Sequence, residues 1–275
     1  MQAIIKAGTP RGEVQAPPSK SVVHREIICS ALAAGESTIS GAAMSKDIEA
    51  TVRAVRALGA EVSQEKEKSS GGLSLGVRGI GSDVKSCGSP EKNVSDDLPV
   101  LDCGESGSTL RFMIPVALLS GGGMFRCAPR LIERGISVYE DAFLPLGIGI
   151  SIHKDTSEIL VRGRLRPGAF EIPGDVSSQF VSGLLFALPL LEGDSRIFVR
   201  PPVESRPYID ITVDILKKAG IELDICDDTA SGGAITFEIP GQQKYRARHW
   251  KAEGDWSNGA FLLGMNTLAK YGPAS

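Results

Sequence analysis

Three turns rich in serine and glycine carry the side chains of this sequence that could bind a small anion. They are the segments PPSKS, CGESGSTLR and GDVSSQF, and an apolar run of helical length follows each of them. A helix that begins at such a turn presents unpaired backbone N–H groups and the positive end of its dipole, which attract phosphate or carboxylate. Three such helix starts held together would form a compact anion site.

The first turn combines hydroxyl groups with positive charge. Ser19 and Ser21 flank Lys20, and Arg25 follows about one turn into the predicted helix. The alternative is that Ser19 caps the helix while Lys20 and Arg25 are solvated. Such short motifs match by chance often enough that both interpretations stay open for this turn taken alone.

The third turn offers neutral groups. Ser177 and Ser178 supply hydroxyls and Gln179 an amide, which bind phosphate well when cations are near. Capping of the helix by Asp175 or Ser177 is the alternative, and it is favoured when the turn is considered alone.

The second turn contains Gly107, where a ligand could approach the backbone closely, and Arg111. Glu105 would repel an anion there unless it pairs with a base such as Arg111.

Two further loops carry basic residues. APRLIERG contains Arg130 and Arg134, and PPVESRPYID contains Ser205, Arg206 and Tyr208. Arginine can hold phosphate or carboxylate through two parallel hydrogen bonds, which makes Arg130 a candidate clamp. Solvated loop arginines are commoner in general, but the two loops recur at matching places of successive repeats, and this favours binding.

An internal repeat must position these turns. Lys20, Ser106 and Ser178 each lie fifteen residues before a glycine, at Gly35, Gly121 and Gly193. A second glycine follows 24, 26 or 27 residues later, at Gly59, Gly147 and Gly220. Strand-like segments close each unit, so the pattern predicts β-α-β-α-β-β three times.

The two helices of a unit differ in their apolar pattern. The first type, Leu110–Leu119 and Phe180–Leu191, is apolar almost all round, which indicates helices buried inside a domain with sheets outside them. Pro115 and Pro189 should kink or end these helices. The second type, such as Asp47–Leu58, is apolar on one side and predicts a surface helix.

A fourth copy begins near the end of the sequence. Ser257 lies fifteen residues before Gly272, but no second helix or closing strands follow. We therefore expect the chain to be a piece of a longer protein.

Composition narrows the class of protein. The chain has 275 residues, 42% hydrophobic, with a formal net charge of −3, so we expect a globular protein without a broad basic surface for nucleic acid. We expect no membrane span, since no window is long and apolar enough. Free thiols in the cytoplasm are expected because the five cysteines are scattered, at Cys29, Cys87, Cys103, Cys127 and Cys226.

Other common sites are not indicated. The sequence lacks the G-x-S-x-G, G-x-x-x-x-G-K-[ST] and helix-opening G-x-G-x-x-G motifs. We expect no metal, because no acidic cluster has calcium- or magnesium-type spacing. His24, His153 and His249 have no obvious acid partner nearby in the sequence and are predicted to be structural.

Six separated motifs together resemble the EPSP synthase family over nearly the whole chain. They are PPSKSVVHR, GESGSTLRF, APRLIERG, GDVSSQF, SRPYIDIT and EGDWS, in this order. The resemblance implies an inside-out α/β barrel of repeated units, with two lobes of three units each. It also implies transfer of the enolpyruvyl group of phosphoenolpyruvate to the 5-hydroxyl of shikimate 3-phosphate, in aromatic amino-acid biosynthesis, without a cofactor.

The resemblance also implies roles for individual residues. Lys20 resembles a catalytic lysine that meets both ligands. The implied contacts of shikimate 3-phosphate are Lys20, Ser21, Arg25, Ser177, Ser178, Gln179, Ser205 and Tyr208. The implied contacts of phosphoenolpyruvate are Lys20, Gly107, Arg130 and Gln179. Two positions depart from the family pattern, since Glu105-Ser106-Gly107-Ser108 stands where many members have Asn-Ala-Gly-Thr, and Phe112 where some have proline.

The expected boundaries follow from the repeat and the resemblance. Residues 14–245 form the lobe for shikimate 3-phosphate, with units at about 14–80, 98–166 and 168–241, while 1–13 and 246–275 belong to a second, incomplete lobe. The family's catalytic aspartate lies in that missing lobe, which would be supplied in cis or in trans. We therefore expect the chain alone to bind the shikimate ligand without turnover.

Three alternatives differ in class. A UDP-N-acetylglucosamine enolpyruvyl transferase is disfavoured because Lys20-Ser21 stands where that family has Lys-Asn. A noncatalytic module for a phosphorylated ligand and a structural repeat scaffold also stay open.

Overall fold

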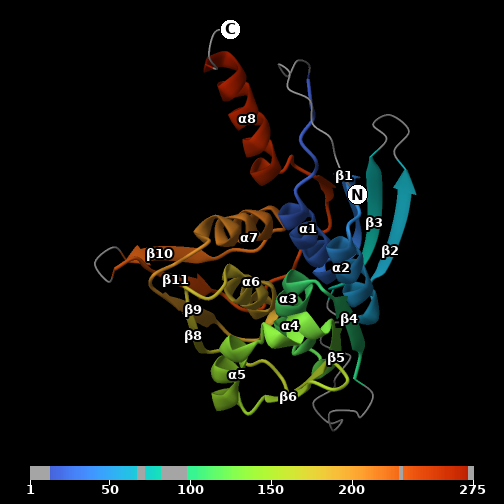
Figure 1. The fold of residues 1–275 in the computed structure, drawn as a ribbon. Coiled ribbons are helices and arrows are strands. Elements are labelled where there is room, and N and C mark those ends of the chain that lie inside the picture. Colours follow the sequence, from blue (N-terminus) through green and yellow to red (C-terminus); the bar gives the residue numbers. More distant parts are fainter. Residues whose placement is uncertain (1–12, 67–71, 82–97, 229–231, 272–275) are drawn as a thin grey trace.

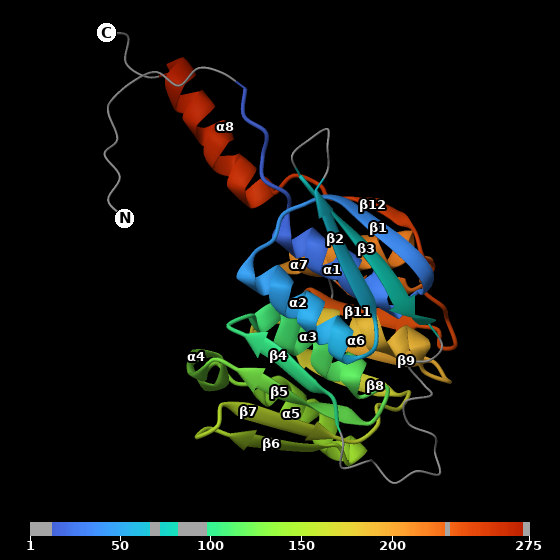
Figure 2. The same cartoon turned by 90° about the vertical axis from the view of Figure 1, so that its right-hand side faces the viewer.

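Three four-stranded sheets surround three buried helices in the computed structural model, which describes residues 13–66, 72–81, 98–228 and 232–271 (Figures 1 and 2). The sheets have the strand orders β12-β1-β3-β2, β4-β5-β7-β6 and β8-β9-β11-β10. In each sheet the first two strands are parallel and the other pairs are antiparallel. This arrangement confirms the expected inside-out α/β architecture of repeated units.

The second and third units follow the predicted order of elements. The second contains β4 (Val100–Gly104), α3 (Gly107–Ala117), β5 (Gly122–Cys127), α4 (Pro129–Glu133), α5 (Ser137–Phe143), the 3-10 turn η2 (Leu144–Leu146), β6 (Gly149–His153) and β7 (Glu158–Arg162). The third contains β8 (Ala169–Pro173), α6 (Ser178–Ala187), the 3-10 turn η3 (Leu188–Leu190), β9 (Ser195–Arg200), α7 (Arg206–Lys218), β10 (Asp224–Asp228) and β11 (Ala234–Ile239).

The first unit differs from the prediction in its first strand. It contains α1 (Lys20–Leu32), β1 (Ala34–Ala42), α2 (Lys46–Ala57), β2 (Glu61–Lys66) and β3 (Leu73–Ile80), with no strand ahead of α1 within the described residues. Pro17 and Pro18 lack the N–H groups that a ladder requires. The place beside β1 is taken by β12 (His249–Lys251), which pairs parallel to it.

The strand β12 attaches the end of the chain to the three-unit lobe. Trp250 is buried, and its indole N–H donates to the Ser30 hydroxyl at 2.9 Å. We expected residues 246–275 to belong to a second lobe; residues 249–251 of this segment pair with β1 in the first sheet. The helix α8 (Trp256–Tyr271) follows and projects away from the lobe (Figures 1 and 2).

The inner helices α1, α3 and α6 form the core, as their apolar sequences predict. Almost every residue of the three is buried. Pro189 lies in η3, so the α-helix of the third unit ends before it, as predicted. The outer helices α2 and α7 bury one side each, with Ile48, Val52 and Val55 turned inward on α2.

A close crossing fixes α3 against α6. Pro115 lies inside α3 and has no N–H for the carbonyl of Arg111. That carbonyl is within 2.8 Å of the Tyr139 hydroxyl, which is also 2.9 Å from the carbonyl of Phe180 and donates to one of the two. A Cβ at Gly183 would stand 2.3 Å from the Arg111 oxygen, so only glycine permits this approach.

Candidate functional site

Each of the three inner helices begins directly after a serine, next to or at the repeated positions Lys20, Ser106 and Ser178. Ser19, Ser106 and Ser177 occupy the N-cap positions of α1, α3 and α6. The Ser106 hydroxyl accepts the backbone N–H of Thr109 at 3.2 Å, and that of Ser177 accepts the N–H of Gln179 at 3.3 Å. Capping is therefore a real role of Ser177, whereas the Ser19 side chain makes no cap bond.

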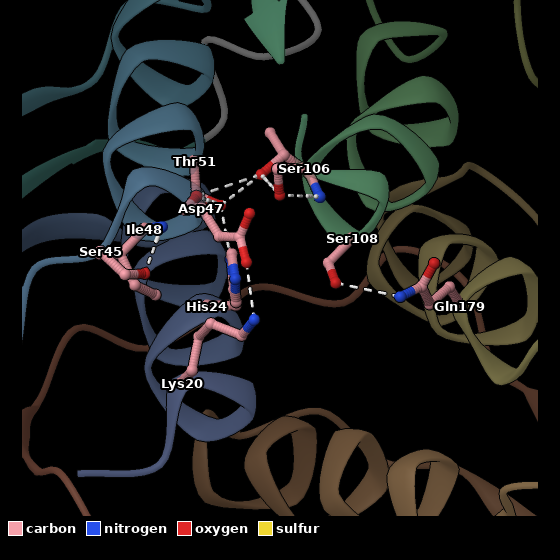
Figure 3. Close-up of polar contacts among 10 residues, drawn as sticks. Lys20, His24, Ser45, Asp47, Ile48, Thr51, Ser106, Ser108 and Gln179 are labelled. Carbon is pink, nitrogen blue, oxygen red and sulfur yellow. Dashed lines mark hydrogen bonds and ion pairs between the residues drawn. The ribbon is translucent and has the colours of Figure 1, made fainter. Parts of the chain in front are cut away.

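Lys20 projects from the first residue of α1 and pairs with the outer helix α2. Its Nζ lies 2.6 Å from Oδ2 of Asp47, and both side chains keep partial exposure. One turn deeper, His24 Nδ1 lies 2.6 Å from Oγ1 of Thr51. The ion pair and the buried contact repeat four residues apart on both helices, which fixes α1 against α2 (Figure 3).

A line of hydroxyl groups continues from α2 to the start of α3. Thr51 Oγ1 is 2.8 Å from Thr109 Oγ1, which is 2.8 Å from Oγ of Ser106 (Figure 3). The carbonyl of Asp47 lies 3.4 Å from both threonine hydroxyls. The N-terminal turns of α1, α2 and α3 are thus held in one polar network.

Gln179 connects the start of α6 to the start of α3. Its Oε1 accepts from Nη1 of Arg111 at 2.7 Å, and its Nε2 donates to the Ser108 hydroxyl at 3.0 Å. In Figure 3, Ser108 and Gln179 face the side of the site that carries Lys20 and Asp47. Glu105 is exposed, so the considered pair between Glu105 and Arg111 is replaced by the amide of Gln179.

Arg25 is buried where α1, α6 and α7 meet. It donates to the hydroxyl of Thr212 at 2.7 Å, to the carbonyls of Ser21 at 2.7 Å and Tyr208 at 2.9 Å, and at 3.5 Å to Ser182. Its guanidinium also lies 5.0 Å from the ring centre of Phe112. The predicted solvated alternative for Arg25 is therefore wrong.

Arg25 and Arg111 are buried cations without a neutralising acid. They are 3% and 4% exposed, and no carboxylate of the described ranges lies within ion-pair distance of either guanidinium. Burial lowers the pKa of Arg25 to about 10, and burial together with the nearby charge of Arg134 lowers the pKa of Arg111. Both stay charged at neutral pH, so their side of the site attracts an anion.

Gly107 begins α3 under two guanidinium groups. A Cβ built on it would lie 3.1 Å from Nη1 of Arg111 and 3.3 Å from Nη1 of Arg134. These distances bring Arg134 to the same helix start as Gly107. Glycine leaves room for the two guanidinium groups beside the backbone of this buried turn.

The other predicted site residues are placed less directly. Ser178 is buried as the first residue of α6, and Tyr208 is exposed on the first turn of α7. Ser205 is exposed and caps α7 with a left-handed φ of 55°. Arg130 is exposed on α4. The side chains of Ser205 and Arg130 make no hydrogen bond to another predicted site residue.

Asp47, Ser108 and Arg134 are residues of this region that the motifs did not assign to the site. Asp47 lies 27 residues after Lys20, and only the packing of α2 on α1 brings the two together. Arg134 belongs to a predicted basic loop, and the shared loop was its one signal. His24 was predicted to be structural, and its partner Thr51 lies on another helix.

Two cavities lie beside the helices of the lobe. One of about 600 Å³ opens at the opposite ends of the inner helices, beside Leu32, Leu119 and Leu190. Another of about 520 Å³ lies between α1, α7 and β12. Within the described residues, no group of acidic, histidine or cysteine side chains could hold a metal ion, and no helix could cross a membrane.

Comparison with known proteins gives one consistent family. Residues 6–270 match the family of EPSP synthase (3-phosphoshikimate 1-carboxyvinyltransferase). The chain is 40% identical over 265 residues to the 3-phosphoshikimate 1-carboxyvinyltransferase of Clostridium botulinum (strain Eklund 17B / Type B), covering 96% of this chain and 57% of that protein. It is 37% identical to the same-named protein of Clostridium perfringens (strain SM101 / Type A), covering 97% and 58%.

A solved structure agrees in fold. The EPSP synthase of Acinetobacter baumannii superposes with a TM-score of 0.69 at 24% identity, over 92% of this chain and 52% of that one. The chain thus spans about half the length of the curated relatives it matches.

Proposed function

The chain belongs to the EPSP synthase family, and we propose that it supplies the shikimate 3-phosphate lobe for enolpyruvyl transfer. In that reaction the 5-hydroxyl of shikimate 3-phosphate adds to phosphoenolpyruvate, and inorganic phosphate leaves. The product is an intermediate of aromatic amino-acid biosynthesis. We place this step in the cytoplasm, in keeping with the free cysteines Cys29, Cys103, Cys127 and Cys226.

The observation that carries the proposal is the pair of buried, unneutralised arginines at the helix starts. A buried cation that bonds neutral oxygens alone is expensive unless an anion completes its surroundings. Arg25 uses four of its five N–H groups on neutral partners, which leaves one on Nη1. This remaining N–H suits the carboxylate or a hydroxyl of the shikimate ring.

The phosphorylated ring would lie between α1, α6 and α7. Ser177 and Ser178, at the start of α6, are proposed to hold its phosphate together with Ser205 of α7. Tyr208 would cover the ring from the first turn of α7, and Ser21 and Gln179 would bond it from the other two helices. Lys20 would leave Asp47 or bridge it to the ligands, since its ammonium is at the exposed rim.

Phosphoenolpyruvate would bind toward α3 and α4. Gly107 offers backbone N–H groups there, and Arg130 and Lys20 offer charge, with Gln179 between the two ligands. We add Arg111 and Arg134 as charges of this subsite, because both guanidiniums lie within 3.3 Å of a Cβ built on Gly107. No cofactor or metal is needed for this binding.

We propose that the 275-residue chain by itself binds shikimate 3-phosphate without turning over. Addition needs a proton for the methylene carbon of phosphoenolpyruvate and a base near the attacking hydroxyl. Asp47 is occupied by Lys20, so the base is assigned to the length of the relatives that this chain does not span.

The exposed apolar residues of α8 support a partner lobe, in cis or in trans. Trp256 is 80% exposed and Phe261 77% exposed, and Leu263 is exposed as well. Such a surface is normally covered by protein. We assign to that second lobe the residues from α8 onward and residues 1–13, of which 1–12 lie outside the described part of the chain.

Calorimetric titration with three ligands in parallel tests the proposal. Shikimate 3-phosphate should bind with a saturating heat, whereas UDP-N-acetylglucosamine and buffer should give none. Binding of UDP-N-acetylglucosamine would favour the UDP-N-acetylglucosamine enolpyruvyl transferase. No heat of binding with any of the ligands would favour a structural scaffold. A coupled assay for phosphate release with both substrates then separates a binding module from a complete enzyme.

A further inference from the structure

A buried chain of hydroxyl groups connects the imidazole of His24 to the start of α3. Its contacts are 2.6 Å from His24 Nδ1 to Thr51, 2.8 Å from Thr51 to Thr109 and 2.8 Å from Thr109 to Ser106 (Figure 3). Each hydroxyl has one hydrogen, so the whole chain donates either toward Ser106 or toward His24. A mixed order either leaves the two threonine oxygens 2.8 Å apart with no hydrogen between them or sends a hydrogen to the Asp47 carbonyl at 3.4 Å, and both are less favourable.

The surroundings of the ring decide the direction. Burial, and then the charge of Arg25, lowers the pKa of His24 to about 3, so the ring is neutral and has one N–H. Nε2 is buried and has no hydrogen-bond partner in the described part of the chain. A buried N–H without an acceptor is rarer than a buried lone pair without a donor. The hydrogen therefore belongs on Nδ1, where Thr51 accepts it.

We propose that His24 is a positioning residue that directs this hydroxyl chain toward Ser106, and so adds an O–H donor to the anion site at the start of α3. In this direction Ser106 Oγ accepts from the hydroxyl and the backbone N–H of Thr109, and its own hydrogen is left to donate. In the opposite direction Ser106 would present a lone pair beside Gly107. A donor there reinforces the backbone N–H groups that bind an anion, whereas a lone pair repels it. The effect on binding rests on the proposed function.

The tautomer can be tested without any ligand. The sequence has three histidines, so nitrogen NMR of histidine-labelled protein resolves each ring. His24 should show a protonated Nδ1 and a bare Nε2, unchanged between pH 5 and 8. Thr51→Val removes the acceptor and should shift the ring toward a mixture of tautomers. A ring with its hydrogen on Nε2, or one that Thr51→Val leaves unaltered, would overturn the inference whatever the ligands do.

The second test follows the NMR signal of the Gly107 backbone amide, at the start of α3, during titration with phosphoenolpyruvate, and so measures the affinity at this helix start. His24→Leu removes the donor and should weaken binding about tenfold, the effect of one ordinary hydrogen bond. His24→Asn keeps an N–H near the position of Nδ1 and should stay close to wild type. His249→Leu is the matched control, because it removes an exposed histidine–threonine contact of the same 2.6 Å length.

Equal affinity for His24→Leu and wild type would contradict the proposal, as would equal loss for His24→Asn and His24→Leu. If His24→Leu does not fold, Thr109→Val against Thr109→Ser interrupts or keeps the same chain one contact further on. A wild-type chain whose Gly107 signal ignores phosphoenolpyruvate would count against the proposed phosphoenolpyruvate subsite, and the tautomer measurement would still decide the role of His24.

Discussion

Gln179 offers a substitution pair in which folding stability and ligand affinity should change separately. Its Oε1 accepts a 2.7 Å bond from the buried cation Arg111, and its Nε2 donates to Ser108. Gln179→Met keeps the length of the side chain but removes both bonds. A charge-assisted bond contributes roughly 1.5–3 kcal/mol and a neutral one about 1 kcal/mol. The free energy of unfolding should therefore fall by about 3 kcal/mol.

Gln179→Glu should do the reverse. The carboxylate still accepts from Arg111, and Ser108 can donate to it, so unfolding should change by about 1 kcal/mol or less. The new negative charge, however, would repel the bound anion, and two like charges a few ångströms apart cost on the order of 3 kcal/mol at an effective dielectric constant of 20. Affinity for shikimate 3-phosphate should then fall roughly a hundredfold.

Urea denaturation and calorimetric titration measure the two quantities, with the same two substitutions at the exposed Gln64 of β2 as controls. If Gln179→Met has the same free energy of unfolding as the wild type, the hydrogen bond between Gln179 and Arg111 does not contribute to stability. Gln179→Glu with wild-type affinity would remove Gln179 from the anion site.

Three further outcomes follow from the same contacts. Ser177→Ala together with Ser178→Ala should weaken shikimate 3-phosphate binding by about 2–4 kcal/mol in titration, against Ser151→Ala on the exposed strand β6, and unchanged affinity would exclude both hydroxyls. Arg25→Lys keeps the positive charge but loses the planar guanidinium that donates to four oxygens. The free energy of unfolding, measured by urea denaturation, should therefore fall by about 2–4 kcal/mol. Wild-type stability of this variant would contradict the contacts of Arg25. Burial, and then the charge of Glu253, raises the pKa of Glu26 to about 7 against the opposing charges of Lys218 and Arg248. The folded state therefore holds more protons than the unfolded state between about pH 4.5 and 7, and the free energy of unfolding should fall by about 3 kcal/mol as the pH rises through this window. Glu26→Gln should abolish this pH dependence in denaturation curves.

Local sequence patterns predicted the helix starts and ends that are determined by residues near them in the sequence. The three inner helices begin within one residue of the repeated positions Lys20, Ser106 and Ser178, because apolar runs and N-cap residues are recognised from neighbouring residues. Pro189 ended its α-helix as expected.

Features that depend on distant partners were not accessible in this way. The strand β12 replaces a first strand that Pro17 and Pro18 prevent, and no local signal tells that residues 249–251 return to β1. Likewise Arg111 could pair with Glu105, its neighbour in sequence, yet it bonds Gln179 because α3 and α6 cross closely at Gly183. The left-handed backbone of Ser205 is set by the loop before α7.

The resemblance to a family named site residues that local physics left open. Its strength was the number of separated motifs, and the buried environment of Arg25 and the contact of Gln179 with Arg111 agree with it. Arg134 and Asp47 were not predicted as site residues, because charge and spacing alone do not distinguish a solvated loop or helix residue from one that faces a site.

Titration of this 275-residue chain with shikimate 3-phosphate tests the central claim most directly. The arrangement of Lys20, Arg25, Ser178 and Gln179 predicts one saturable site per chain, with affinity lost in Gln179→Glu and retained in the exposed Gln64→Glu control. Absence of binding by a folded chain, or binding that Gln179→Glu leaves intact, would contradict the assignment of this lobe to shikimate 3-phosphate.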